Sequence, residues 1–167
     1  MYHCYGGAHS SVTAANIHLG LLSPKEQPGY RDIAGQKLFD FQVVKDSGKI
    51  VFMGRDKYGN EIFIVGRRSR PELLYNITGI LCEALGINGN NIMLVDVSCH
   101  VNLLMKIGGF LSRRVGLVFP GRFLVTVGTL ISYRGIKEKV KTVLSEIEHH
   151  RERSSADTMT VYCEVGN

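Results

Sequence analysis

Short apolar runs alternate along this chain with longer segments of helical periodicity, and this alternation limits the folds open to it. The runs are rich in Val, Ile, Leu and Phe, and they lie at 49–54, 61–66, 91–97 and 122–127. The segments between and after them place apolar residues three and four positions apart, as amphipathic helices do; they are 12–22, 71–85 and 128–150. The alternation predicts an α/β fold, a three-layer sandwich with a mainly parallel sheet.

Local signals refine this expectation. The turn-forming residues 56–60 separate two β-rich runs, so 49–66 predicts a β-hairpin inserted into the sheet. The nearly continuous run at 91–97 is typical of a strand buried on both faces, and 122–127 predicts another, followed by a helix opened by Gly128 and Thr129. Ser69 and Glu72 have the spacing of a capping box, with Pro71 in the first turn of the helix that follows.

The chain length of 167 residues suits one domain with a buried core. We expect this domain to span 1–150, with a long loop at 25–48 that holds one short helix at most. Residues 151–167 would form a tail, or an edge strand at 158–165.

Composition excludes several classes of protein. The apolar fraction of 44% and the mean hydropathy of +0.03 are those of a folded protein and not of a disordered one. The most apolar region, 101–132, is interrupted by charged residues, so it predicts no membrane-spanning helix. The chain starts without a signal-peptide pattern and its four cysteines form no CxxC, which favours a reduced, cytoplasmic protein. The net charge of +5 is spread over short groups, so we expect a small anionic partner and no nucleic acid, and without a spanning segment we expect no membrane partner.

The strongest local feature is the stretch His3–Ser11, which predicts a strand, a glycine-rich loop and a helix start. Gly6 and Gly7 let the backbone curl so that N–H groups of the loop converge, and the positive end of the next helix adds to their field. Ser10 or Ser11 is the natural N-cap of that helix. A thiol at the mouth of such a loop has its thiolate stabilised, which lowers its pKa and makes it a nucleophile, so Cys4 is the candidate.

The spacing Cys4-x-x-Gly7-x-x-Ser10-Ser11 resembles the phosphocysteine loop in the cysteine components of bacterial sugar-phosphotransferase systems. It also resembles the Cys-x5-Arg loop of low-molecular-weight tyrosine phosphatases and arsenate reductases. The arginine of that second pattern is Ser10 here, so an arginine that clamps a phosphoryl group must come from elsewhere. The arginines available for this are Arg67, Arg68, Arg113 and Arg114.

A wider resemblance covers most of the chain. The start YHCYGGAHSS, the hairpin FMGRDKYGNE with VGR after it, and the segment GGFLSRR are similar to an uncharacterised clostridial domain-of-unknown-function family. That resemblance implies a stand-alone domain of this size and assigns no catalytic residue.

A second polar cluster, 96–100, follows the strand predicted at 91–97. If that strand neighbours the first one, Asp96 lies near Cys4 and can act as a general acid or base, or hold a magnesium ion. A metal site is a further alternative by ligand type, although no standard zinc spacing supports it; its ligands would come from His3, Cys4, His9, Cys99 and His100. Cys82 lies on an apolar helix face and is expected in the core.

Together these signals predict a protein that binds a phosphate-bearing or other anionic small molecule at the Cys4–Ser11 loop. In the sharper form of this hypothesis, Cys4 is the nucleophile of a phosphoryl-transfer or phosphatase-like reaction, with Asp96 or His9 moving a proton. The anion would be held by Gly6, Gly7, Ala8, Ser10, Ser11, Arg67 and Arg113. Two alternatives stay open: a non-catalytic sensor of a nucleotide or phosphometabolite, and a loop whose glycines serve packing alone. The sequence assigns no cofactor, no metal and no oligomeric state.

Overall fold

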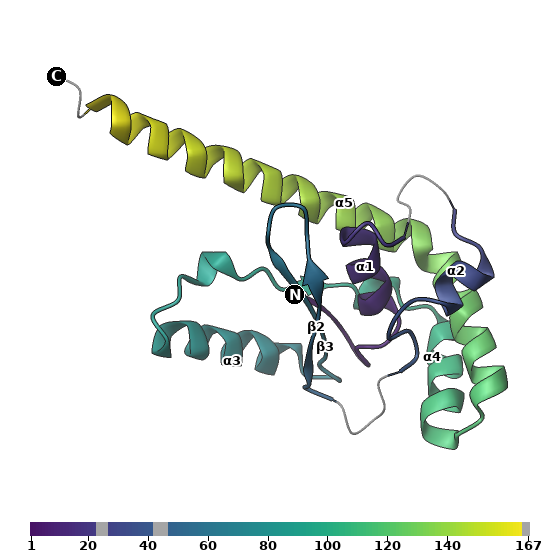
Figure 1. Ribbon diagram of the computed structural model, residues 1–167. Coiled ribbons are helices and arrows are strands. Elements are labelled where there is room, and N and C mark those ends of the chain that lie inside the picture. The colour runs from purple at the N-terminus through teal and green to yellow at the C-terminus, as the bar shows by residue number, and fades with distance from the viewer. Residues whose placement is uncertain (23–26, 42–46, 165–167) are drawn as a thin grey trace.

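The computed structural model describes residues 1–22, 27–41 and 47–164 (Figure 1). The strands are β1 (Tyr2–Cys4), β2 (Ile50–Arg55), β3 (Glu61–Gly66) and β4 (Val95–Asp96). The α-helices are α1 (Ser10–His18), α2 (Tyr30–Ala34), α3 (Pro71–Ala84), α4 (Leu103–Phe110) and α5 (Val118–Glu164). Short helical turns lie at η2 (Gly89–Asn91), η3 (Ser98–His100) and η4 (Leu111–Val115), the last of them π-helical.

The four strands form one open sheet in the order β2-β3-β1-β4. Strand β1 lies in the middle and pairs in parallel with β3 and β4, so that Cys4 aligns with Gly66 and His3 with Asp96. Strand β2 is antiparallel to β3. The structure therefore confirms a mixed α/β fold with a mainly parallel sheet and the hairpin at 49–66. The carboxyl ends of β1, β3 and β4 meet at one edge.

Successive side chains of β1 point to opposite faces of the sheet, so they contact two different layers. Tyr2 and Cys4 contact α1, through His18 and Ser11, whereas His3 faces the other way and contacts Tyr75 of α3. Every residue of α1 is buried, because this helix lies between the sheet and α5 (Figure 1). The apolar core joins these layers; its fully buried members include Val12, Ile33, Ile64, Val97, Val125 and Ile136.

The strand predicted at 122–127 is wrong, because these residues belong to α5. A run of five apolar and β-branched residues, 123–127, does not by itself distinguish a strand from a buried helix. Thr126 and Thr129 fit the helix because their hydroxyls donate to the carbonyls of Arg122 and Val125, four residues earlier, at 2.7 and 2.8 Å. Gly128 and Thr129 therefore lie inside a helix and do not open one.

Three glycines spaced by seven residues explain why α5 packs so closely on the preceding elements. A Cβ on Gly121 would come within 2.8 Å of Ser112 and Gly108, one on Gly128 within 2.9 Å of Met105, and one on Gly135 within 2.5 Å of His100. A seven-residue spacing keeps these positions on one face of a helix. Gly121 and Gly128 thus let α5 approach the backbone of α4 and η4, and Gly135 leaves room for the His100 ring of η3.

Other local predictions need correction. Strand β4 covers only Val95–Asp96, since the first part of 91–97 follows the turn η2. The capping box does not form: Arg70 is the N-cap of α3, without a side-chain cap bond, although Pro71 does occupy the first turn. Likewise, the N-cap of α1 is His9, and neither Ser10 nor Ser11 occupies that position. Helix α5 continues to Glu164, so no edge strand forms over 158–164.

Two predictions about the rest of the chain are confirmed. Cys82 is buried, and the segment 128–150 is helical, with Ile136, Val140 and Val143 of α5 in the core. Over the described ranges, no helix is both long and apolar enough to cross a membrane.

Candidate functional site

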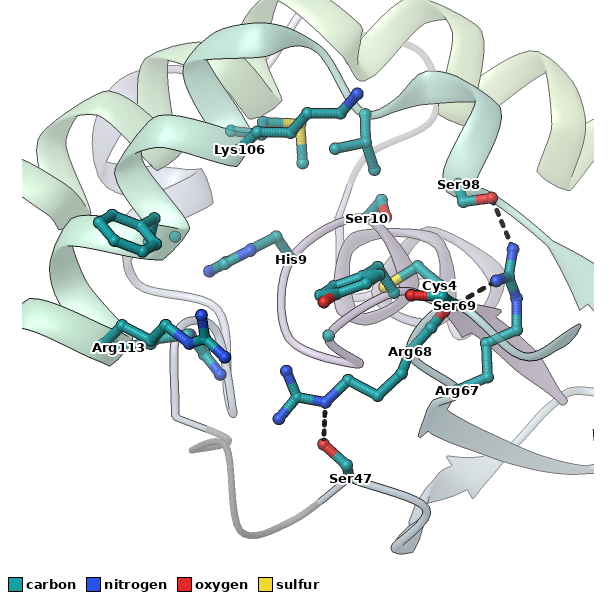
Figure 2. Close-up of a pocket in the computed structure, with 17 residues that line it drawn as sticks. Cys4, His9, Ser10, Ser47, Arg67, Arg68, Ser69, Ser98, Lys106 and Arg113 are labelled. Carbon is teal, nitrogen blue, oxygen red and sulfur yellow. Dashed lines mark hydrogen bonds between the residues drawn. The ribbon is translucent and has the colours of Figure 1, made fainter.

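A cavity of about 590 Å³ opens at the edge where the parallel strands end. Its walls come from the loop after β1, the segment after β3, the segment after β4, and the helices α4 and η4 (Figure 2). Ligand sites of open α/β sheets lie at this edge, as predicted from the strand ends. The lining residues are Cys4, Tyr5, Gly6, His9, Ser10, Ser47, Arg67, Arg68, Ser69, Ser98, Val101, Met105, Lys106, Gly109, Phe110, Arg113 and Arg114.

The charge of this lining is one-sided. Five of the lining residues are Arg or Lys, and none is Asp or Glu. The four arginines that the sequence offered as phosphate clamps, Arg67, Arg68, Arg113 and Arg114, all contribute to the wall. Such a lining attracts anions and repels cations.

The glycine loop curls around the sulfur of Cys4. Gly7 has a φ of +70°, which glycine adopts without strain, and its N–H donates to Cys4 Sγ at 3.2 Å. The thiol itself donates to Ser11 Oγ at 3.3 Å. Cys4 is almost fully buried yet lines the cavity floor. The loop thus holds the sulfur in one position by two hydrogen bonds.

Close packing of β3 against this loop depends on Gly66. A Cβ on Gly66 would lie 2.8 Å from the carbonyl carbon and oxygen of Gly6 and 3.1 Å from the nitrogen of Gly7. Beyond it, the N–H groups of Arg67 and Arg68 donate to the carbonyls of Cys4 and Tyr5 at 3.0 and 2.9 Å. The end of β3 therefore fixes the start of the loop.

Ser10 begins helix α1 and lines the cavity. Its side chain is fully buried, and its Oγ has no hydrogen-bond partner among the described residues. The first N–H groups of a helix carry partial positive charge and lack partners within the helix. An unpartnered hydroxyl beside them is where an oxyanion finds donors.

Arg113 carries the second unpartnered polar atom. Its Nε donates to Asp40 Oδ1 at 2.9 Å, while its Nη2 is buried and has no partner in the part of the chain that the structure describes. Like Ser10, Arg113 lines the cavity (Figure 2). A buried donor without an acceptor costs about 1–3 kcal/mol, so a ligand that supplies the acceptor recovers this energy.

Asp40 organises this side of the cavity from behind. Its carboxylate contacts His9 Nε2 at 2.9 Å, Arg113 Nε at 2.9 Å and Ser112 Oγ at 3.3 Å, and its backbone N–H donates to the carbonyl of Ala8 at 3.1 Å. Its φ of +58° is unusual for a residue with a side chain. Burial alone would raise the pKa of Asp40, but the hydrogen bonds from His9 and Arg113 outweigh it and lower this pKa below 3.8.

The same pairing sets the state of His9. Burial lowers the pKa of His9 below 6.5, an effect that the hydrogen bond with Asp40 opposes only in part. Because the carboxylate of Asp40 is ionised, Nε2 of the neutral ring carries the hydrogen and donates it. Nδ1 of His9 is then a hydrogen-bond acceptor.

Asp96 lies next to the site but does not line the cavity. Strands β1 and β4 are neighbours, as the prediction required, and Asp96 accepts from Arg67 Nη2 at 2.8 Å. Burial raises the pKa of Asp96, but hydrogen bonds from Ser98 and Arg67 outweigh it, so the pKa is lowered below 3.8. Arg67 also donates to Ser98 Oγ at 2.9 Å and to His3 Nδ1 at 3.0 Å. This network ties the ends of β1, β3 and β4 together.

The remaining predicted residues divide into two groups. The cavity lining includes Cys4, Gly6, His9, Ser10, Arg67 and Arg113. Gly7, Ala8 and Ser11 support the loop from behind, through the hydrogen bonds to Cys4 and Asp40. Cys99 and His100 do not line the cavity, and in the described part of the chain no group of three or more His, Cys, Asp or Glu residues could hold a metal ion.

Sequence reasoning missed the α4 wall and Asp40. The wall consists of Met105, Lys106, Gly109 and Phe110, with Val101 just before the helix, and it reaches the cavity because α4 packs on α5. The glycines at 121, 128 and 135 were the signal that could have revealed this packing. Asp40 lies in an aperiodic polar segment, where no pattern marks it.

Of three comparisons with known proteins, one gave a match. Neither the search of curated proteins nor the search of solved structures returned a match. The likeness of the loop to phosphocysteine loops therefore receives no support from them. A family model does match residues 1–144, which are most of the chain, and its description is "Protein of unknown function (DUF3189)". The chain therefore belongs to the DUF3189 family, in agreement with the resemblance noted in its sequence.

Proposed function

We propose that the cavity binds a small molecule carrying a phosphate or a similar oxyanion. The observation that carries the proposal is that two residues lining a cationic cavity, Ser10 and Arg113, each have a buried donor without a partner among the described residues, Ser10 Oγ and Arg113 Nη2. Native proteins pair nearly all of their buried polar atoms. Two exceptions in residues that line the same cavity, one of them at the N-terminus of α1, are explained together if an anion is their common partner.

The size and walls of the cavity favour an organic phosphate over a bare ion. A volume of about 590 Å³ lies in the range of sites for drug-sized ligands. Val101, Met105 and Phe110 supply apolar lining in and just before α4, while Arg67 and Arg68 line the cavity from the segment after β3 and Arg113 from η4. The phosphate would lie against Ser10 and Arg113, and the apolar part of the ligand against α4.

A sharper form of the proposal makes Cys4 the nucleophile of phosphoryl transfer. The sulfur would attack phosphorus, forming an S–P bond while the P–O bond to the leaving group breaks, and the proton of the thiol would end on the leaving oxygen. Water would then hydrolyse the phosphocysteine to inorganic phosphate and the free thiol. The hydrogen bond from Gly7 N–H to Sγ supports this role because it stabilises negative charge on sulfur. His9 is the candidate for carrying the proton.

Binding without catalysis is the second candidate, and Asp96 favours it. The carboxylate that was expected to move a proton is held by Arg67 and does not line the cavity. A site that holds an organic phosphate without a general acid beside the leaving group would act as a sensor.

Phosphate-dependent thermal stability tests the binding proposal. Sodium phosphate should raise the melting temperature above that in sodium chloride of equal ionic strength, because a ligand stabilises the state that it binds. Arg113→Gln should reduce this rise, whereas Arg55→Gln should leave it unchanged, since Arg55 is an exposed surface arginine paired with Glu61. Equal rises in all three proteins would contradict the proposal.

Alkylation separates the two candidates. Iodoacetamide labelling at neutral pH, followed at each cysteine by peptide mass spectrometry, compares Cys4 with buried Cys82 and exposed Cys99. A nucleophilic Cys4 labels faster than Cys99 despite its burial, and phosphate protects it. If Cys4 labels as slowly as Cys82, phosphoryl transfer through Cys4 is wrong and the sensor remains.

A further inference from the structure

The junction between η4 and α5 exposes large apolar side chains to solvent. This junction, residues 114–123, is here named the α4–α5 tip; it comprises the end of η4, a two-residue turn and the first residues of α5, and it lies at the end of the helical pair away from the carboxyl end of α5 (Figure 1). Phe119 is 87% exposed, more than any other large hydrophobic residue described. At least half of each neighbouring apolar side chain is exposed as well; they are Val115, Leu117, Val118 and Phe123. Contiguous apolar exposure of this kind marks an interaction surface.

The chain segment that forms the tip carries charge of a single sign, although Asp40 pairs with Arg113 just before it. Between Asp96 and Glu138 the sequence contains six Lys or Arg residues and no Asp or Glu. Two of these, Arg114 and Arg122, are exposed within the tip itself. Positive charge next to exposed apolar groups is complementary to a partner that is both anionic and apolar.

The alternatives fit these observations less well. A second copy of this chain meeting the tip face to face would bring like charges together, which is unfavourable. A nucleic acid offers phosphates, but it has no hydrocarbon region for aliphatic side chains such as Leu117 and Val118. An anionic bilayer offers both a negative surface and hydrocarbon.

We propose that the α4–α5 tip binds peripherally to the surface of a membrane that contains anionic phospholipids. Phe119 and its apolar neighbours insert between the headgroups, and Arg114 and Arg122 contact lipid phosphates. This is surface contact and not a membrane-spanning segment. It adds a membrane partner where the sequence predicted none, because the sequence reasoning considered only spanning helices. The proposal does not rest on ligand binding in the cavity.

Vesicle binding tests it. The full chain is titrated with vesicles of phosphatidylcholine alone and with vesicles of equal parts phosphatidylcholine and phosphatidylglycerol, at low and moderate salt. Each basic residue near an anionic surface contributes about 1 kcal/mol, so two should strengthen binding to the anionic vesicles by at least about tenfold. Salt should weaken this binding.

The chain lacks tryptophan, so a single introduced tryptophan reports on its own position. Phe119→Trp should shift its fluorescence to the blue when anionic vesicles are added. Ile80→Trp is the matched control: Ile80 is also well exposed, at 64%, but it lies on α3, whose charged side chains are acidic. Its spectrum should not change.

A pair of serine variants completes the test. Phe119→Ser should weaken vesicle binding about tenfold, while Ile80→Ser and Ser10→Ala leave it unchanged, and circular dichroism verifies folding. The proposal is overturned if anionic vesicles do not bind, or if Phe119→Ser binds like the wild type. It is also overturned if the tip instead mediates self-association in gel filtration or binds single-stranded DNA without binding vesicles.

Discussion

Replacing Ser10 by alanine should change stability and ligand affinity in opposite directions. The Ser10 hydroxyl is fully buried and has no partner within the described chain, so removing it costs the fold no hydrogen bond. A buried unsatisfied polar group destabilises the folded state by about 1–3 kcal/mol. Ser10→Ala should therefore leave the free energy of unfolding of the ligand-free protein unchanged, or raise it by up to about 1–3 kcal/mol.

The effect on binding has the opposite sign. A hydrogen bond to a charged group contributes about 1.5–3 kcal/mol, so losing the Ser10 donor should raise the dissociation constant of an organic phosphate about tenfold to a hundredfold. Urea denaturation without ligand measures the first quantity, and calorimetric titration with phenyl phosphate measures the second.

Ser11→Ala is the matched control. Ser11 is equally buried and adjacent, but its hydroxyl accepts the hydrogen bond of the Cys4 thiol and does not line the cavity. Its loss should lower the free energy of unfolding by about 0.5–1.5 kcal/mol and affect binding less than Ser10→Ala does. If Ser10→Ala destabilises the ligand-free protein as much as Ser11→Ala, or leaves affinity unchanged, the reasoning is refuted.

Two further predictions concern stability. Gly66→Ala should destabilise the protein by about 1–3 kcal/mol, because the new Cβ would meet the Gly6 backbone at 2.8 Å. Gly6→Ala is the control: its Cβ would meet nothing within 4 Å, so it should be tolerated. Equal melting temperatures of the two variants would contradict this prediction. Burial lowers the pKa values of four histidines below the ordinary 6.5, so the unfolded chain binds more protons and stability should fall as pH drops below about 6.5. The slope has an upper limit of about 1.4 kcal/mol per pH unit for each histidine, measured by urea denaturation at a series of pH values, and a flat profile between pH 7 and 5 would be inconsistent with the prediction; the histidines are His3, His9, His18 and His100.

The strand–loop–helix start could be predicted because its signals are local. The Gly6–Gly7 pair and the short apolar strand before it act within about ten residues, and they place Cys4 and Ser10 at the carboxyl edge of the sheet. The order of elements confirms this start. Whether β1 and β4 are neighbours was left open by the sequence, and the register of the sheet shows that they are.

The errors arose where distant packing decides the local structure. Residues 122–127 have the composition of a strand, but glycines at 121, 128 and 135 let α5 pack against α4, and that contact favours the helix. Arg113 was a candidate on residue type alone, whereas its partner Asp40 was not recognised. Asp40 has a left-handed backbone conformation, which the residues around it in the sequence do not predict.

The central claim is that an oxyanion occupies the space between Ser10 and Arg113. The most direct measurement is a crystal structure of the full chain with tungstate, whose anomalous scattering locates the ion unambiguously. The account predicts a peak within hydrogen-bonding distance of Ser10 Oγ and Arg113 Nη2, lost in Arg113→Gln crystals. A tungstate found only at exposed surface lysines, with the cavity holding water alone, would contradict it.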